Sequence, residues 1–186
     1  MKKGLFILFF FIIIVCSAQM GTWTQKGNVP VPGLGQTDAA AFQINGKGYI
    51  ATGYNSVAVI TDSWEYDPTI DSWTQIASFT GSARQGAVGF SLFGKGYVVT
   101  GRNGNTHYND VYEYDPVGNT WTIQGNFPGA LRSRAVAFTI DSLGYIGTGA
   151  DINISALSDF WAYSATTDTW TQRQSLPTTR SEAMGF

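Results

Sequence analysis

Apolar and polar residues alternate along this chain in short segments that recur every 48 residues. The middle period contains four such segments, and each is rich in β-branched or aromatic residues and bounded by Gly, Asn, Asp or Pro. They cover residues 85–92, 96–101, 110–114 and 120–124. No window has a helical apolar period long enough to compete. The pattern predicts an all-β chain in which every period forms a four-stranded sheet.

Two series of aromatic residues mark the period. The first has a spacing of 48 residues: Phe42, Phe90, Phe138 and Phe186. The second has the same spacing: Tyr49, Tyr97 and Tyr145. A fixed period of this length with four short strands is typical of propeller blades. The predicted units are residues 36–83, 84–131 and 132–179, with a partial unit from 180.

Within a unit, the strands differ in composition in the way a blade requires. The first strand consists of small residues, for example Gly86-Ala87-Val88-Gly89, which suit the position nearest the axis where blades crowd together. The third strand alternates large rings, for example Tyr112 and Tyr114, which suit the widening space between neighbouring blades. Position within the unit therefore predicts position within the blade.

The predicted propeller is incomplete. The chain enters with Trp23 on an outer, fourth strand, passes through three whole units and stops at Phe186 within a first strand. That amounts to about 3.5 repeats, whereas propellers have at least about four blades. We expect the sequence to be a fragment of a longer protein that lacks C-terminal blades. The alternative is an oligomer that completes the ring between chains.

Residues 1–18 have the composition of a secretory signal peptide. A lysine pair precedes an unbroken run of eleven apolar residues, and Cys16-Ser17-Ala18 follows as a small-residue cleavage site. Such a run is shorter than the roughly 20 residues that span a bilayer. We predict a secreted, periplasmic or cell-surface protein, residues 19–186, with no membrane span after cleavage. A lipoprotein anchored at Cys16, which Val15 disfavours, and a retained membrane anchor are the alternatives.

Charge and cysteine content exclude some classes of function. Removal of residues 1–18 takes away two lysines and changes the formal net charge from −2 to −4. A mildly acidic chain lacks the basic face that a general nucleic-acid binder needs, so we expect no nucleic-acid partner. Cys16 is the only cysteine, so the mature chain would have no disulfide and no thiol chemistry.

Three spaced features recur together in the three units: a small-residue strand, a Gly-Tyr strand that ends in Thr-Gly, and an aromatic strand followed by a tryptophan. In the middle unit they begin with Arg84-Gln85-Gly86-Ala87-Val88-Gly89-Phe90 and Gly94-Lys95-Gly96-Tyr97. This order resembles the Kelch repeat, and more narrowly the secreted Kelch proteins of the Bacteroidetes type. Kelch repeats usually have Gly-Gly where this chain has Thr-Gly. The resemblance implies a propeller of four-stranded blades.

The unshared loops predict where a binding site lies. A meander places its connections alternately at two ends of the blade, and one end carries loops without a common pattern: residues 54–61, 102–109 and 150–158. Variable loops on a rigid frame are where binding usually resides. We therefore predict the site on this loop face.

Arginines recur at the same face. Arg84, Arg132 and Arg180 each precede their repeat phenylalanine by six residues, and Arg102 and Arg134 lie near them. Guanidinium forks bond carboxylates bidentately, so arginines around a channel mouth predict a binder of carboxylates or acidic sugars. Kelch proteins that bind peptides resemble this in using arginines at the start of the inner strand. The alternative is that each arginine ties its blade to the next through backbone carbonyls.

Three further loop residues are candidate ligand contacts: Tyr54, His107 and Tyr108. Exposed tyrosine rings stack on sugars, although they also pack across loops. The lone histidine cannot form a histidine-rich metal site by itself, and its alternative role is that of an exposed loop residue. The surrounding loop lacks the dense carboxylates of a calcium site. We predict no metal and no cofactor.

Resemblance to the propellers of galactose oxidase and sialic acid epimerases raises an enzymatic alternative. The galactose oxidase site implies copper, several histidines and a crosslinked cysteine, which a single histidine and no mature cysteine exclude within these residues. Asp38, Arg134 and Glu182 share one repeat position and predict either a charged ring or inter-blade ion pairs. We predict a non-enzymatic scaffold that binds an extracellular glycan or protein. The alternative is a sugar-modifying enzyme with catalytic residues in missing blades.

Overall fold

The computed structural model describes residues 22–30 and 35–185. Over these residues the chain is all-β, with three four-stranded antiparallel sheets and one two-stranded sheet. The predicted signal peptide and Phe186 lie outside the described residues. Within the described part of the chain, no helix is long and apolar enough to cross a membrane.

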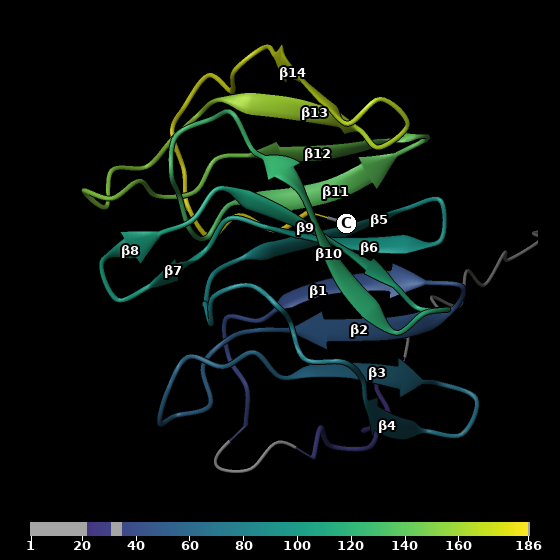
Figure 1. The fold of residues 1–186 in the computed structure, drawn as a ribbon. Helices are drawn as coiled ribbons and strands as arrows, with labels where there is room; N and C mark the ends of the chain where they lie inside the picture. The colour runs from purple at the N-terminus through teal and green to yellow at the C-terminus, as the bar shows by residue number, and fades with distance from the viewer. Residues whose placement is uncertain (1–21, 31–34, 186) are drawn as a thin grey trace, which may run out of the picture.

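Each four-stranded sheet is formed by one sequence unit (Figure 1). The first contains β1 (Ala40–Ile44), β2 (Lys47–Ala51), β3 (Ser63–Asp67) and β4 (Ser72–Gln75). The second contains β5 (Val88–Leu92), β6 (Lys95–Val99), β9 (Asp110–Asp115) and β10 (Thr120–Asn126). The third contains β11 (Val136–Ile140), β12 (Leu143–Gly147), β13 (Phe160–Ser164) and β14 (Thr169–Arg173). The small sheet is a hairpin of β7 (Arg102–Asn103) and β8 (Thr106–His107).

The two aromatic series of the sequence meet across the first two strands of every sheet. Phe90 pairs directly with Tyr97 in the β5–β6 ladder, and their rings stack with centroids 5.2 Å apart. The equivalent pairs stack at 5.3 Å in the first sheet and 5.6 Å in the third. The 48-residue spacing therefore reflects a cross-strand pair that each blade repeats.

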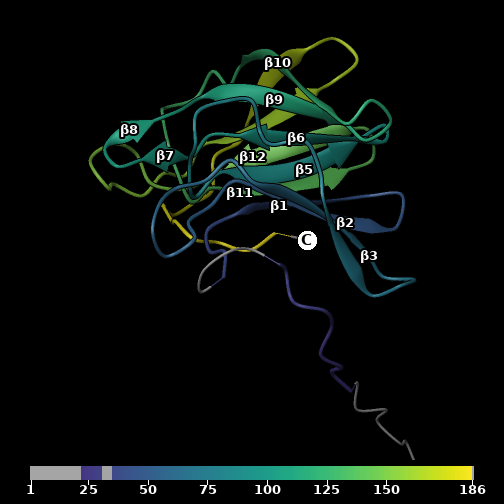
Figure 2. The same ribbon diagram turned by 60° about the horizontal axis from the view of Figure 1, so that its bottom comes forward.

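The sheets stack through their first strands, with β5 between β1 and β11. Figure 2 shows these inner strands side by side, with the C-terminal segment beside them. The hollow along them is lined largely by small residues of the predicted innermost strands: Ala39, Ala41, Ala87, Gly89, Ala135 and Ala137. Small side chains let the blades approach closely at the axis.

Between neighbouring sheets, a phenylalanine covers a glycine. A Cβ atom on Gly96 would overlap the ring of Phe42, and one on Gly144 would overlap the ring of Phe90. Tyrosines of the third strands complete the contact, since Tyr163 is 1% exposed and lies 5.6 Å from the ring of Tyr97. Burial of these rings therefore stabilises the packing of one blade on the next.

The Thr-Gly dipeptide ends the second strand of each blade. Its threonines have positive φ angles of 64°, 66° and 61° at Thr52, Thr100 and Thr148. Gly149 has a φ of 94°, and a Cβ atom there would lie 2.7 Å from the Ser133 carbonyl oxygen, so only glycine fits. Its N–H donates to the Arg180 carbonyl at 2.9 Å, which links one blade to the segment that follows.

Candidate functional site

The loop face contains a cleft of about 110 Å³ between the second and third blades. Two unshared loops and the segment before β11 form its walls. The lining residues are Arg102, Asn105, His107, Ser133, Arg134, Ala150, Asp151, Ile152 and Ile154. The structure thus brings together three of the predicted site residues, from loops about 30 residues apart.

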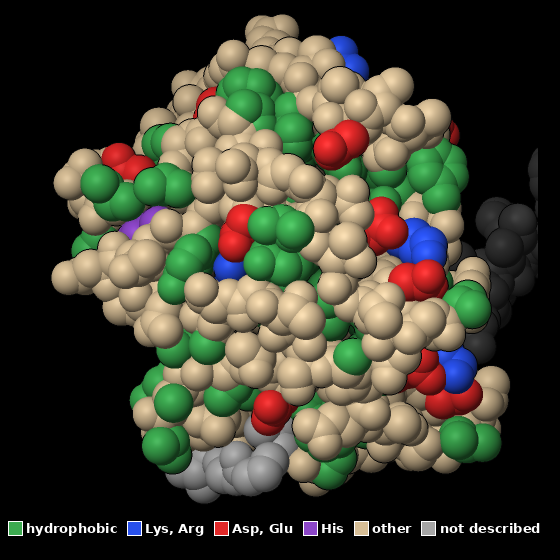
Figure 3. All heavy atoms as spheres, viewed as in Figure 1, with side chains coloured by type: hydrophobic (Ala, Val, Ile, Leu, Met, Phe, Trp, Pro, Cys, Tyr) green, Lys and Arg blue, Asp and Glu red, His purple; other side chains and the backbone are tan. Residues whose placement is uncertain are grey.

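One wall of the cleft is the β7–β8 hairpin, which projects from the blades (Figures 1 and 2). Its turn is Gly104-Asn105, and Gly104 has a φ of 56°, the left-handed conformation that such two-residue turns need. Arg102 donates to the Gly104 carbonyl at 3.2 Å, and the His107 ring nitrogen Nδ1 lies 3.3 Å from the Asn105 carbonyl. His107, the one histidine, appears as the purple surface at the left of Figure 3.

The opposite wall is a tight turn at residues 151–155. The carboxylate of Asp151 accepts the backbone N–H groups of Asn153 and Ser155 at 2.8 and 2.9 Å. The turn holds Ile154 at a φ of 63°, which is strained for a β-branched residue, and leaves its side chain 83% exposed. A rigid turn therefore presents an aliphatic side chain to solvent beside the cleft.

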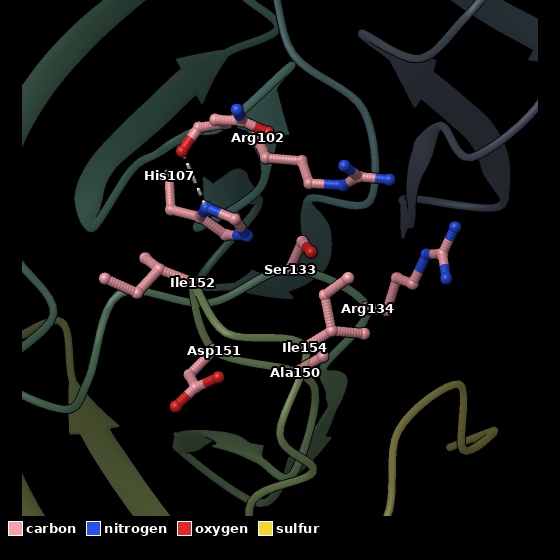
Figure 4. A pocket seen from close by; sticks show the side chains of 9 residues that line it. Arg102, His107, Ser133, Arg134, Ala150, Asp151, Ile152 and Ile154 are labelled. Carbon is pink, nitrogen blue, oxygen red and sulfur yellow. Dashed lines mark hydrogen bonds between the residues drawn. The ribbon is translucent and has the colours of Figure 1, made fainter.

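The cationic groups lie at one side of this cleft. In Figure 4 the guanidinium groups of Arg102 and Arg134 extend to the same side, away from Ile152 and Asp151. Arg134 also forms a salt bridge with Glu182 at 2.7 Å, and both side chains are exposed to solvent, at 38% and 62%. Asp38, the third charged residue at that repeat position, contributes its backbone carbonyl to Gly86. Part of the predicted charged ring is thus an exposed ion pair.

Arg84 and Arg132 do not reach this cleft. Both side chains are fully buried, at 0% exposure, and each forms a bidentate salt bridge with the aspartate at the start of its own third strand. Arg132 donates to both carboxylate oxygens of Asp159, at 2.7 and 2.6 Å, and to the Thr148 carbonyl at 2.9 Å. These guanidinium groups tie the strands of one blade together and have no face open to a ligand.

The remaining candidates are dispersed. Arg180 is exposed and donates to the Thr178 hydroxyl at 2.7 Å, away from the cleft lining. The ring of Tyr108 covers the Arg84 guanidinium at 4.2 Å, so its face is already occupied. Tyr54 is 36% exposed on the loop of the first blade. The structure does not gather these three residues with Arg102, His107 and Arg134.

The buried salt bridge of the third blade predicts a dependence of stability on pH. Burial raises the pKa of Asp159, but hydrogen bonds from Arg132 and Trp161 and the Arg132 charge outweigh it, so the pKa is lowered. A carboxyl group whose pKa is lowered by folding stabilises the folded protein at pH values above its unfolded-state pKa, which is about 4 for aspartate. This stabilisation is lost as the pH falls through the folded-state pKa.

We therefore expect the stability difference between wild type and Asp159→Asn to be largest at neutral pH and to shrink below about pH 4. Urea unfolding at a series of pH values, followed by tryptophan fluorescence, measures it. Asp141→Asn, in an exposed turn, is the control and should match wild type. A difference that stays constant down to acid pH would contradict the assignment.

Comparison with known proteins identifies the type of blade. The family model of the Kelch motif matches residues 97–128, which run from β6 into the segment after β10. The chain folds as a Kelch-repeat propeller. The solved structure of YjhT matches 86% of this chain and 57% of its own, with a TM-score of 0.74 and 18% sequence identity. At this identity the likeness shows the Kelch-type fold alone. No curated protein matches the sequence.

Several cleft residues of this Kelch propeller were not candidates on sequence grounds: Asn105, Ser133, Ala150, Asp151, Ile152 and Ile154. The dipeptide Gly104-Asn105 was one usable signal in the sequence. A pair of this kind is typical of two-residue hairpin turns, so it predicts a strand on each side, as β7 and β8 are. The described residues contain no group of three His, Cys, Asp or Glu side chains that could hold a metal ion.

Proposed function

We propose that this chain is a secreted binding scaffold whose loop face binds a carboxylate-bearing ligand, either an acidic glycan or an acidic protein segment. The observation that supports it is the pair of guanidinium groups, Arg102 and Arg134, on one cleft between unshared loops. A Kelch-type propeller provides the rigid frame, and arginine is the residue best suited to planar carboxylates.

The size of the cleft limits what enters it. Pockets that enclose a small-molecule ligand usually have about 300–1,000 Å³, whereas this cleft has about 110 Å³. It therefore suits one carboxylate group of a larger ligand that lies across the loop face. His107 lines the cleft and would contact such a carboxylate. Glu182 forms a salt bridge with Arg134, and the ligand carboxylate would displace it.

Binding should fall at least tenfold in the Arg102→Gln, Arg134→Gln double variant, because each lost contact between a charged pair contributes about 1.5–3 kcal/mol. Arrays of uronic-acid and sialylated glycans and of acidic peptides, followed by titration of the hits, measure it. Arg173→Gln, an exposed arginine on β14, is the matched control. If hits appear only among the glycans or only among the peptides, they identify which class of molecule carries the carboxylate. Undiminished binding by the double variant would reject the cleft as the site.

A further inference from the structure

The cleft on the loop face has an aliphatic wall as well as cationic groups. Ile152 and Ile154 line it, and their side chains are 58% and 83% exposed. In Figure 4 the guanidinium groups of Arg102 and Arg134 extend to the side away from Ile152. Two exposed isoleucines on one small cleft form an apolar surface whose removal from water by a ligand is favourable. A carboxylate on the arginines alone leaves this surface without a role.

The turn that carries the isoleucines holds one of them in a conformation that isoleucine disfavours. Ile154 has a φ of 63°, in the left-handed region where Gly, Asn and Asp are far more common. Asp151 fixes this shape, because its carbonyl accepts the Ile154 N–H at 3.0 Å and its own N–H donates to the Ser155 carbonyl at 3.0 Å. Backbone strain that the surrounding structure enforces is concentrated at active sites and ligand contacts. The strained, exposed side chain of Ile154 is therefore a candidate ligand contact.

The corresponding loop of the first blade is built in the same way. The side-chain oxygen of Asn55 accepts the N–H groups of Val57 and Ala58 at 3.1 and 2.9 Å, as the Asp151 carboxylate accepts two N–H groups of its own turn. The turn presents Val57, which is 83% exposed. A ligand that lies across the loop face would therefore meet aliphatic side chains on two blades.

An aliphatic wall favours a protein segment over a glycan. A sugar ring against this wall would turn hydroxyl groups towards side chains that cannot bond them, which costs free energy. Among the described residues that line the cleft, none is Phe, Tyr or Trp, so no such ring is available for a sugar to stack on. The ring of Tyr108, on the neighbouring hairpin, already covers Arg84. Protein interfaces, in contrast, combine apolar contacts with arginine–carboxylate pairs.

We propose that the ligand is a protein segment in which an aliphatic side chain adjoins a carboxylate side chain. The inference rests on the proposed carboxylate site: the carboxylate bonds Arg102 and Arg134, and the aliphatic side chain packs on Ile152 and Ile154. Asp151 fixes the direction of binding, because its negative charge on the isoleucine turn repels a ligand carboxylate placed there.

Paired peptides test the proposal on the full chain. Each peptide carries one fixed Glu in a Gly-Ser background, with either Leu or Ser at one of the nearby positions on each side, and titration by fluorescence anisotropy measures the affinity. We expect Leu at one position or more to raise the affinity at least tenfold over Ser, because burial of an aliphatic side chain contributes about that factor or more.

The Ile152→Ser, Ile154→Asn double variant should abolish this increase, so that the Leu and Ser peptides bind alike. Asparagine suits the left-handed φ at position 154, so urea unfolding should show a variant as stable as the wild type. Ile123→Ser is the matched control for the surface isoleucine, because Ile123 is also 58% exposed but lies on β10. It should keep the tenfold increase.

Equal affinity of the wild type for the Leu and Ser peptides would overturn the inference and leave the carboxylate site standing. An increase that persists in the Ile152→Ser, Ile154→Asn variant, or binding of uronic-acid or sialylated glycans alone, would have the same consequence. If the wild type binds no carboxylate probe of either kind, the proposed function and this inference fall together.

Discussion

Replacing Arg132 with methionine is expected to lower the free energy of unfolding by about 3 kcal/mol, because the change removes one partner of a buried salt bridge. The guanidinium is fully buried and donates to Asp159, to the Thr148 carbonyl and to the Ala130 carbonyl. Its plane also lies over the Phe127 ring at 4.9 Å. Methionine fills similar space but removes the guanidinium donors of the carboxylate and of both carbonyls, so the carboxylate keeps the Trp161 indole N–H at 2.8 Å but loses its cationic partner.

The repeat supplies the control for this prediction. Arg180 holds the same repeat position, but its side chain is exposed and donates to the Thr178 hydroxyl, so Arg180→Met should cost less than about 0.5 kcal/mol. Urea unfolding at one fixed protein concentration gives both values. Equal stability of the Arg132→Met and Arg180→Met variants would show that the buried salt bridge contributes nothing net. Replacing Asp159 by leucine together with Arg132→Met should recover part of the loss, since no charge then stays unpaired.

The blades could be predicted from the sequence because every element in them is repeated. The predicted strands of the middle unit agree with β5, β6, β9 and β10 to within a few residues at their ends. The first predicted strand starts at residue 85 but β5 starts at Val88, because Gly86 has a φ of 63° and turns the chain. Cross-strand pairing, blade order and the position of the small-residue strands all follow from the 48-residue period.

The arginines show why the candidate site was harder to predict. A repeat places Arg84 and Arg132 near the loop face, yet their side chains could turn outward to a ligand or inward to the blade. The deciding partners are Asp110 and Asp159, which follow them by 26 and 27 residues. The nearly equal Arg–Asp spacing in two units was a signal of pairing. The cleft itself depends on loops without a common pattern, so no repeat could indicate which residues meet there.

Replacing Phe90 with alanine should cost about 3–5 kcal/mol, the second large effect expected in this chain. The ring is 3% exposed and lies between the second and third blades, against Tyr97 at 5.2 Å, Tyr163 at 6.1 Å and the backbone at Gly144. Alanine would leave a cavity at the contact on which blade stacking depends, and the rigid sheets on both sides prevent collapse around it.

Phe93→Ala is the matched control, since Phe93 is 65% exposed in the turn between β5 and β6 and its loss should change stability by less than about 0.5 kcal/mol. Gly144→Ala provides an independent check. It should destabilise the wild type, because the new methyl group overlaps the Phe90 ring, but should cost much less in the Phe90→Ala background, where the space is free. Additive effects of these two substitutions would mean that the ring and the glycine do not form one contact.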